Sequence, residues 1–190
     1  MPAWEFSEKH ETIIRAPAEA VSKALYTVDF SESFIVRWLL KLRGMSGEKV
    51  TLDSLKGSRF EILAERDGEM VIGLAGKFWK PTGNLQKIDA GTFKQFDAPG
   101  FAKAAWNFML VEGGETRETP ETPGAPGSHE ILKQGETRLS TETRIHCTDD
   151  ASRSKFGFYW TFVQPFSGWI RNEMLAVVKR KAEEITGIKG

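Results

Sequence analysis

The sequence predicts a single α+β domain, residues 1–190, in which a curved antiparallel sheet packs against one long C-terminal helix. Two observations support this prediction: residues 149–190 have a helical pattern, and the middle of the chain alternates apolar and polar residues as strands do. A chain of 190 residues can bury roughly 70% of the surface of its unfolded form, enough for one core. Only the last helix is large enough to cover a face of such a sheet.

The N-terminal quarter predicts one strand followed by two short helices. Residues 4–14 alternate apolar and polar side chains, which is typical of a half-buried strand. Pro17 suits the first turn of a helix that continues to about Tyr26. A second short helix is predicted over residues 32–42. One face of this second helix is formed by Phe34, Trp38 and Leu42.

The middle of the chain predicts about six further strands, which gives a sheet of six to seven. Asp67-Gly68 is a strong signal for a two-residue hairpin turn. The segment 113–135 is rich in Gly, Pro, Thr and Glu, so it predicts a flexible hairpin loop. The strands are predicted over 58–66, 69–80, 85–88, 92–96, 101–112 and 136–147.

Residues 149–190 predict one amphipathic helix of unusual length. Oxygen-bearing side chains from Thr148 to Ser152 can accept hydrogen bonds from the free N–H groups of a first turn. About thirty-five helical residues span roughly 50 Å, so the helix has to lie across the sheet. Its apolar face is formed by Phe156, Trp160, Val163, Ile170, Met174 and Val177. That face is widened by Phe158, Phe162, Phe166 and Trp169.

Composition excludes several classes of function. The 26 basic and 26 acidic residues cancel, whereas a protein that binds nucleic acid normally has a basic excess. Cys147 is the only cysteine, so no intramolecular disulfide forms, and we expect a reducing compartment. The sequence contains no apolar run of signal-peptide or transmembrane length. We therefore expect a cytoplasmic protein without stable membrane insertion.

The titratable residues do not form a recognised catalytic or metal-binding motif. His146 and Cys147 are adjacent in a predicted strand, so they point to opposite faces and cannot act as a nucleophile–base pair. We accordingly predict no catalytic residue, no metal and no cofactor. Glu142 and Arg144 share one strand face. They are solvated if Thr141 and Thr143 face the helix, and form a candidate acid/base or ligand anchor if the register is the opposite.

Three stretches resemble the START/Bet v 1-like superfamily (SRPBCC), whose fold is called the helix grip. They are the strand-to-helix junction 14–21, the strand 135–145, and the helix segment 156–171 with its Phe-Gly-Phe-Tyr-Trp beginning. The third is similar to bacterial members described as polyketide cyclase/dehydrase-like. The resemblance implies a seven-stranded curved sheet that closes on the long helix around an apolar cavity. Members include lipid carriers, cyclases and co-chaperones, so it does not select one function.

From these patterns we predict binding or transport of a hydrophobic small molecule or lipid in a cavity between sheet and helix. Trp106 and Phe108 would form a wall, and Thr141 and Thr143 would supply hydroxyls that orient the ligand. The cavity mouth is predicted at Phe34 and Trp38, and the helical lid at Phe158, Phe162 and Phe166. The alternatives are a cyclase- or dehydratase-like enzyme supported by a buried Glu142 or His146, and a protein-interaction module. The sequence leaves the ligand, turnover and oligomeric state open.

Overall fold

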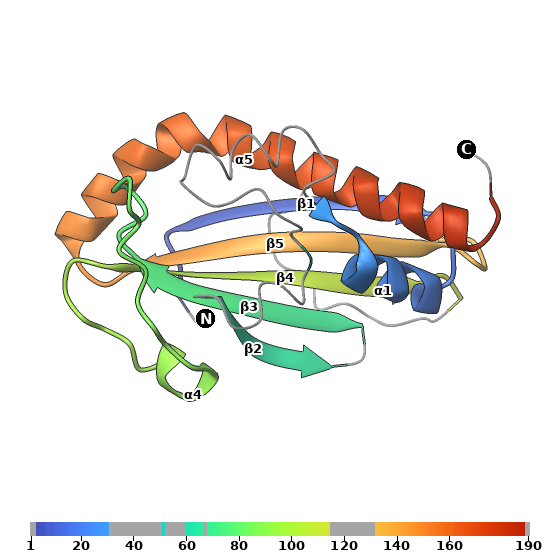
Figure 1. Ribbon diagram of the computed structural model, residues 1–190. Coiled ribbons are helices and arrows are strands. Elements are labelled where there is room, and N and C mark those ends of the chain that lie inside the picture. Colours follow the sequence, from blue (N-terminus) through green and yellow to red (C-terminus); the bar gives the residue numbers. More distant parts are fainter. Residues whose placement is uncertain (1–2, 31–50, 52–59, 67, 115–131, 189–190) are drawn as a thin grey trace.

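The computed structural model describes residues 3–30, 51, 60–66, 68–114 and 132–188. In this part of the chain an open antiparallel sheet packs against a long C-terminal helix, which confirms the predicted α+β class (Figure 1). The described residues form five strands, fewer than the six to seven predicted. The elements are β1 (Phe6–Ile14), α1 (Ala18–Thr27), β2 (Glu61–Arg66), β3 (Glu69–Gly76), α4 (Ala90–Phe93), β4 (Ala102–Glu112), β5 (Thr137–Cys147) and α5 (Asp150–Ile185).

The strand order is β1-β5-β4-β3-β2, with every neighbouring pair antiparallel. The register places Glu8 of β1 opposite Thr143 of β5, and Thr143 in turn opposite Trp106 of β4. One step along, His10 lies opposite Thr141, which lies opposite Phe108. Because side chains directly opposite each other point to the same face, these residues form two rows on one side of the sheet.

Helix α5 lies across that same side of the sheet, close to β1 and β5, while α1 lies beside its C-terminal end (Figure 1). Asp149 begins the helix: its side chain accepts from the Ser152 backbone N–H at 2.6 Å and from the Gly100 N–H at 2.5 Å. The helix runs through 36 residues with Pro165 inside it. The expected polar start and single long C-terminal helix are thus confirmed.

The apolar core consists of two clusters at opposite ends of α5. Near its N-terminal end, Phe156 packs with Ile145 and Cys147 of β5. Near its C-terminal end, Val178 and Ala182 pack with α1, β1 and the central strands. The middle of the helix lies between these two clusters. There its inward side chains include polar ones that hydrogen-bond to the sheet.

Two local predictions need correction. Residues 92–96 were expected to form a strand, but Asp89 and Thr92 instead form a capping box that starts the short helix α4. The Asp89 carboxylate accepts from the Thr92 N–H at 2.7 Å, and the Asp89 N–H donates to Thr92 Oγ1 at 3.1 Å. In 85–88 only Gln86 pairs, through an isolated bridge to Ala75. The predicted helix 32–42 and loop residues 115–131 lie outside the described residues.

Candidate functional site

A cluster of polar side chains lies beneath the middle of α5, between the two apolar core clusters. Ser167 and Arg171 are four residues apart on the inward side of the helix. They replace the large apolar residues found on this face at Phe156 and Leu175. The remaining members of the cluster come from β1 and β5, and they are Glu8, His10, Thr141 and Thr143.

Glu8 is the acceptor at the centre of this cluster. Ser167 Oγ donates to one carboxylate oxygen at 2.7 Å, and His10 Nε2 lies 2.9 Å from the other. The Glu8 side chain is 9% exposed and that of His10 21% exposed. Gly168 allows this close approach, because a Cβ there would lie 2.9 Å from Glu8 Oε1 and 3.3 Å from the His10 ring. The helix and the edge strand are therefore joined by a buried carboxylate.

Arg171 extends from α5 toward β5. Its Nη1 donates to Thr141 Oγ1 at 3.1 Å. Burial lowers the pKa of the guanidinium from 12.5 to about 10, and the nearby Glu8 carboxylate opposes this shift. Because a pKa of about 10 still leaves the group protonated at neutral pH, the site contains one full positive charge and one carboxylate.

Two polar atoms of the cluster are buried without a hydrogen-bond partner: Arg171 Nε and Thr143 Oγ1. A buried polar atom left unpaired costs about 1–3 kcal/mol, so such atoms usually have a partner. Arg171 as a residue is only half-buried although its Nε is out of contact with solvent. Arg171 therefore keeps a donor, and Thr143 a hydroxyl, whose hydrogen-bonding capacity is unused.

Four sequence-predicted site residues are brought together here. Thr141 and Thr143 are 1% and 6% exposed and face α5. Trp106 and Phe108 lie opposite them on β4, on the same side of the sheet. Phe108 is fully buried in the core, whereas Trp106 is half-buried and meets the Phe60 ring at 5.5 Å. Phe34 and Trp38 lie outside the described residues, so their position at a cavity mouth stays a prediction.

The predicted helical lid has the wrong orientation. Phe158, Phe162 and Phe166 are 73%, 61% and 52% exposed and point away from the sheet. The reason is helical periodicity. The inward direction is set by Phe156, and a residue two positions later lies about 200° around the helix. A contact between these three rings and a ligand beneath α5 is therefore not supported by their position.

Glu142 and Arg144 lie on the opposite side of the sheet from α5. Two hydrogen bonds, of 2.7 and 2.9 Å, join the guanidinium of Arg144 to the Glu142 carboxylate, and the guanidinium also lies over the Trp4 ring. His146 shares this outer face and lies 3.2 Å from Glu5. The first of the two registers considered for this strand is correct. Neither Glu142 nor His146 can then serve as an acid or base beneath the helix.

Sequence reasoning missed Glu8, Ser167 and Arg171. Strict alternation from Phe6 puts Glu8 on the apolar face of β1, which is a detectable anomaly for a carboxylate. The inward positions of α5 recur every three or four residues from Phe156, and that series meets Ser167 and Arg171 before it becomes apolar again. Polar residues that interrupt a buried stripe were the available signal.

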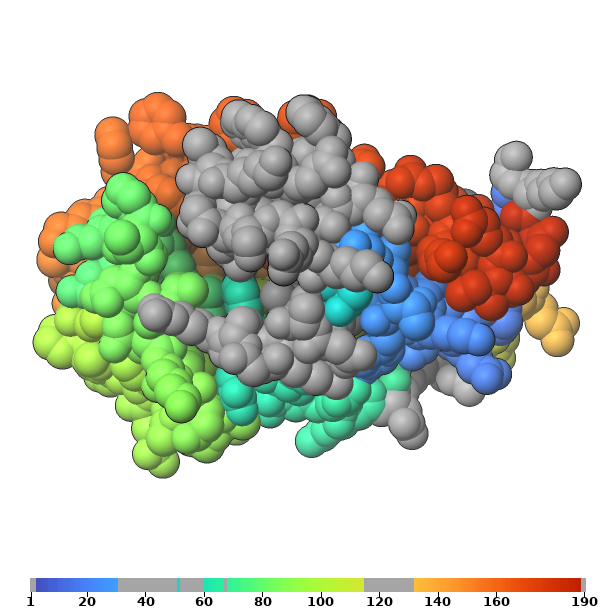
Figure 2. Space-filling model, viewed as in Figure 1, coloured from blue at the N-terminus to red at the C-terminus, as the bar shows by residue number. Residues whose placement is uncertain are grey.

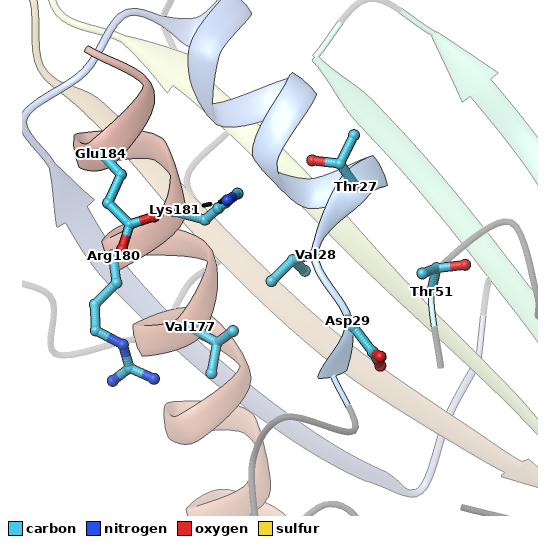
Figure 3. Close-up of a pocket in the computed structure, with 8 residues that line it drawn as sticks. All are labelled: Thr27, Val28, Asp29, Thr51, Val177, Arg180, Lys181 and Glu184. Carbon is cyan, nitrogen blue, oxygen red and sulfur yellow. Dashed lines mark ion pairs between the residues drawn. The ribbon is translucent and has the colours of Figure 1, made fainter. Parts of the chain in front are cut away.

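A separate pocket of about 330 Å³ lies between the end of α1 and the last turns of α5 (Figure 3). It is lined by both signs of charge, and Lys181 and Glu184 pair across 3.6 Å. Among the described residues no group of three or more His, Cys, Asp or Glu side chains is arranged to hold a metal ion. Nor does any described helix have the length and apolar character needed to cross a bilayer.

Comparison with known proteins yields only distant structural similarity. No protein-family model matches the chain, and no curated protein is significantly similar in sequence. The crystal structure of TTHA0849 from Thermus thermophilus aligns over 95% of this chain and 99% of its own, with 10% identity and a TM-score of 0.36. The Zhui aromatase/cyclase from Streptomyces sp. R1128 aligns over 94% and 93%, with 14% identity and a TM-score of 0.31. Both scores are below 0.5, so neither similarity supports a function.

Proposed function

We propose that this protein binds a hydrophobic small molecule between α5 and the sheet, and that the ligand presents a neutral oxygen to Arg171 and Thr143. The observation that supports this most directly is the pair of buried, unpaired polar atoms, Arg171 Nε and Thr143 Oγ1. Nε is a donor and the hydroxyl is a donor or acceptor, so each can bind a carbonyl or hydroxyl oxygen. The binding site then has the usual composition, mostly apolar with a few oriented polar groups.

The apolar part of the ligand would lie over the central strands. Trp106 is half-buried although its row neighbours Ile72 and Thr143 are buried, which leaves part of the indole free to contact a ligand. The polar cluster lies next to this row, because Thr143 pairs with both Trp106 and Glu8. A molecule with an apolar body and one oxygen at its end would place the body against Trp106 and the oxygen against the polar cluster.

Charge favours a neutral oxygen over a carboxylate. Arg171 and Glu8 supply one charge of each sign, and these two charges cancel. A ligand carboxylate would add an unbalanced negative charge close to Glu8 in a partly buried site, and burying an unpaired charge is costly. We therefore expect ketones, aldehydes and alcohols to bind more tightly than fatty acids of the same length.

The first experiment is native mass spectrometry of the purified protein, followed by extraction and identification of any bound molecule. The second is displacement of a fluorescent apolar dye by 2-dodecanone, 1-dodecanol, dodecane and dodecanoate. We expect the ketone and the alcohol to bind about tenfold more tightly than dodecane, equivalent to about 1.4 kcal/mol. Arg171→Met should abolish that preference, whereas Arg180→Met, at an exposed position of the same helix, should keep it.

The two experiments separate the parts of the proposal. Failure of all four compounds to displace the dye, together with no co-purified ligand, would contradict hydrophobic binding itself. Equal binding of all four would retain hydrophobic binding but contradict the role of Arg171. Tighter binding of dodecanoate would mean that the site takes an anion, in contradiction to the charge argument.

A second candidate function, an enzyme of the cyclase or dehydratase type, is favoured by one observation. The Glu8–His10 pair, with its 2.9 Å separation, lies in the electrostatic range of Arg171. A base near a carbonyl held by a guanidinium can remove a proton from the adjacent carbon while the cation stabilises the enolate oxygen. Such a site should exchange the α-protons of bound 2-dodecanone in D2O, measured by NMR, faster than the Glu8→Gln variant. Exchange at the buffer rate would exclude this chemistry.

A further inference from the structure

The outer face of α5 presents four large aromatic side chains to solvent. Phe158, Phe162, Phe166 and Trp169 are 73%, 61%, 52% and 56% exposed, and we call them the outer stripe. Their spacings of four, four and three align them along one side of the helix over about 16 Å. The rings of Phe158 and Phe162 touch, with centroids 5.1 Å apart. Figure 2 shows the first turns of α5, in orange, at the upper left of the molecule and its last turns, in red, at the right.

This exposure is as large as the largest apolar patch on a typical monomer, which covers about 300–600 Å² and is often functional. An aromatic side chain offers about 150–250 Å², so the outer stripe exposes on the order of 400–500 Å² of apolar surface in one row. A contiguous patch of that size usually marks a contact surface. Two such stripes packed together bury about 800–1,000 Å², close to the lower limit for a specific protein–protein interface.

Charges at the two ends of the outer stripe identify what covers it. Lys155 lies on the same side of the helix three residues before Phe158, and Glu173 lies four residues after Trp169. Lys155 and Glu173 are equally far from Gln164, and so are Phe162 and Phe166. If two copies are related by a twofold axis at the level of Gln164, the positive end of the stripe on one helix faces the negative end of the stripe on the other.

We propose that the outer stripe is the interface of a homodimer in which two α5 helices pack antiparallel. Phe162 of one copy then contacts Phe166 of the partner subunit, and Lys155 pairs with Glu173 of the partner subunit. Such a contact is isologous, so it closes after two copies. Within one chain Glu173 has Arg180 at 4.0 Å, the outer limit of an ion pair, with side chains 30% and 63% exposed. It remains accessible to a closer cation.

A lipid surface fits the same residues less well. The chain has equal numbers of acidic and basic residues, and Glu173 lies in line with the outer stripe. A carboxylate at that position is repelled by an anionic bilayer, whereas a second copy offers it a lysine. The charge pattern therefore favours self-association, and vesicle binding becomes an outcome of the test.

The test is sedimentation of the intact protein from about 1 to about 100 μM, a range suited to an interface of this size. We expect a dimer whose affinity falls at least tenfold in Phe162→Glu. Lys155→Glu and Glu173→Lys should each weaken it several-fold, whereas the double exchange should restore it. Lys179→Glu, on another side of α5, serves as the control and should leave the affinity unchanged. Circular dichroism checks that every variant is folded.

Three outcomes would overturn the proposal. The first is a wild-type protein that stays monomeric at the highest concentration. The second is a dimer that Phe162→Glu leaves intact. The third is a monomer that co-sediments with vesicles of phosphatidylcholine and phosphatidylglycerol and loses this binding in Phe162→Glu, because the outer stripe would then serve a lipid surface. Ligand binding beneath α5 uses other residues, so its success or failure is independent of these outcomes.

Discussion

The two faces of α5 both contain large apolar side chains, yet one face is buried and the other is exposed. On the inward face Phe156 and Val178 are 1% and 0% exposed, while on the outer face Phe158 and Trp169 are 73% and 56% exposed. The inward face also contains the polar residues Ser167 and Arg171, which the outer stripe lacks. The more uniformly aromatic face of α5 is thus the one that points away from the sheet. Apolar content alone does not identify the buried side of a helix, because a functional surface can be equally apolar.

The largest expected difference between the faces is in stability. Phe156→Ala should lower the free energy of unfolding by about 3–5 kcal/mol, since it leaves a cavity in the cluster with Ile145 and Cys147. Phe158→Ala should change it by no more than about 0.5 kcal/mol, because that ring is exposed. Urea unfolding at low protein concentration, where dimer contacts do not contribute, measures both. Similar losses for the two variants would mean that the outer ring is buried.

The next effect concerns the polar part of the inward face. Ser167→Ala removes the 2.7 Å hydrogen bond to the Glu8 carboxylate and should cost about 1.5–3 kcal/mol, the range for a hydrogen bond to a charged group. Ser154→Ala is the matched control, since Ser154 is an exposed serine of the same helix. Its cost should remain below about 0.5 kcal/mol. A neutral result for Ser167→Ala in urea unfolding would show that Glu8 is held by His10 alone.

A smaller, pH-dependent effect comes from Cys147, which packs against the inward residue Phe156. Burial raises the pKa of this thiol from 9.0 to about 12. Above pH 9 the unfolded thiol loses its proton while the folded thiol keeps it, so the unfolded state binds fewer protons and the free energy of unfolding falls as pH rises. Between pH 8 and 10 the loss should be about 1.4 kcal/mol.

Cys147→Ala removes this contribution, so its stability should fall less over the same pH interval. Urea unfolding of both proteins at pH 8 and pH 10 gives the difference directly. Parallel pH profiles would indicate that the thiol titrates alike in the folded and unfolded states, and that the cluster around Phe156 is open to solvent.

The smallest expected effect on stability comes from substituting the two glycines of α5, Gly157 and Gly168. Gly157→Ala should stabilise the protein by up to about 1 kcal/mol, because the added Cβ meets its nearest neighbour, the Phe6 ring, at an ordinary 3.5 Å. Gly168→Ala should gain less or lose, because its Cβ would lie 2.9 Å from Glu8 Oε1. Thermal unfolding measures both changes. An equal gain at the two positions would mean that the Glu8 carboxylate moves aside without cost.

Local sequence patterns were sufficient to predict features that depend on neighbouring residues, such as the alternation of a strand or the start of a helix. Alternation in β5 correctly put Thr141 and Thr143 on one face and Glu142 and Arg144 on the other, but it left open which face meets the helix. The row of Trp106 and Phe108 followed from the same rule. The polar residues before α5 correctly marked its start at Asp149. The strand predicted over 92–96 was wrong because the Asp89–Thr92 capping box outweighed strand propensity in a four-residue segment.

The sequence by itself determined the first strand, the helix after it, the alternation of the longer strands and the length of α5, because these depend on residues close together in the chain. Only the tertiary structure decided which of two apolar faces of α5 is buried. The same structure brought Glu8 to Ser167 and Arg171, residues more than 150 positions away. The physical reason is that helical periodicity defines faces but not their partners. Which face of the helix packs on the sheet depends on how well its side chains fit those of strands that are distant in the chain. No single segment of the sequence contains that information.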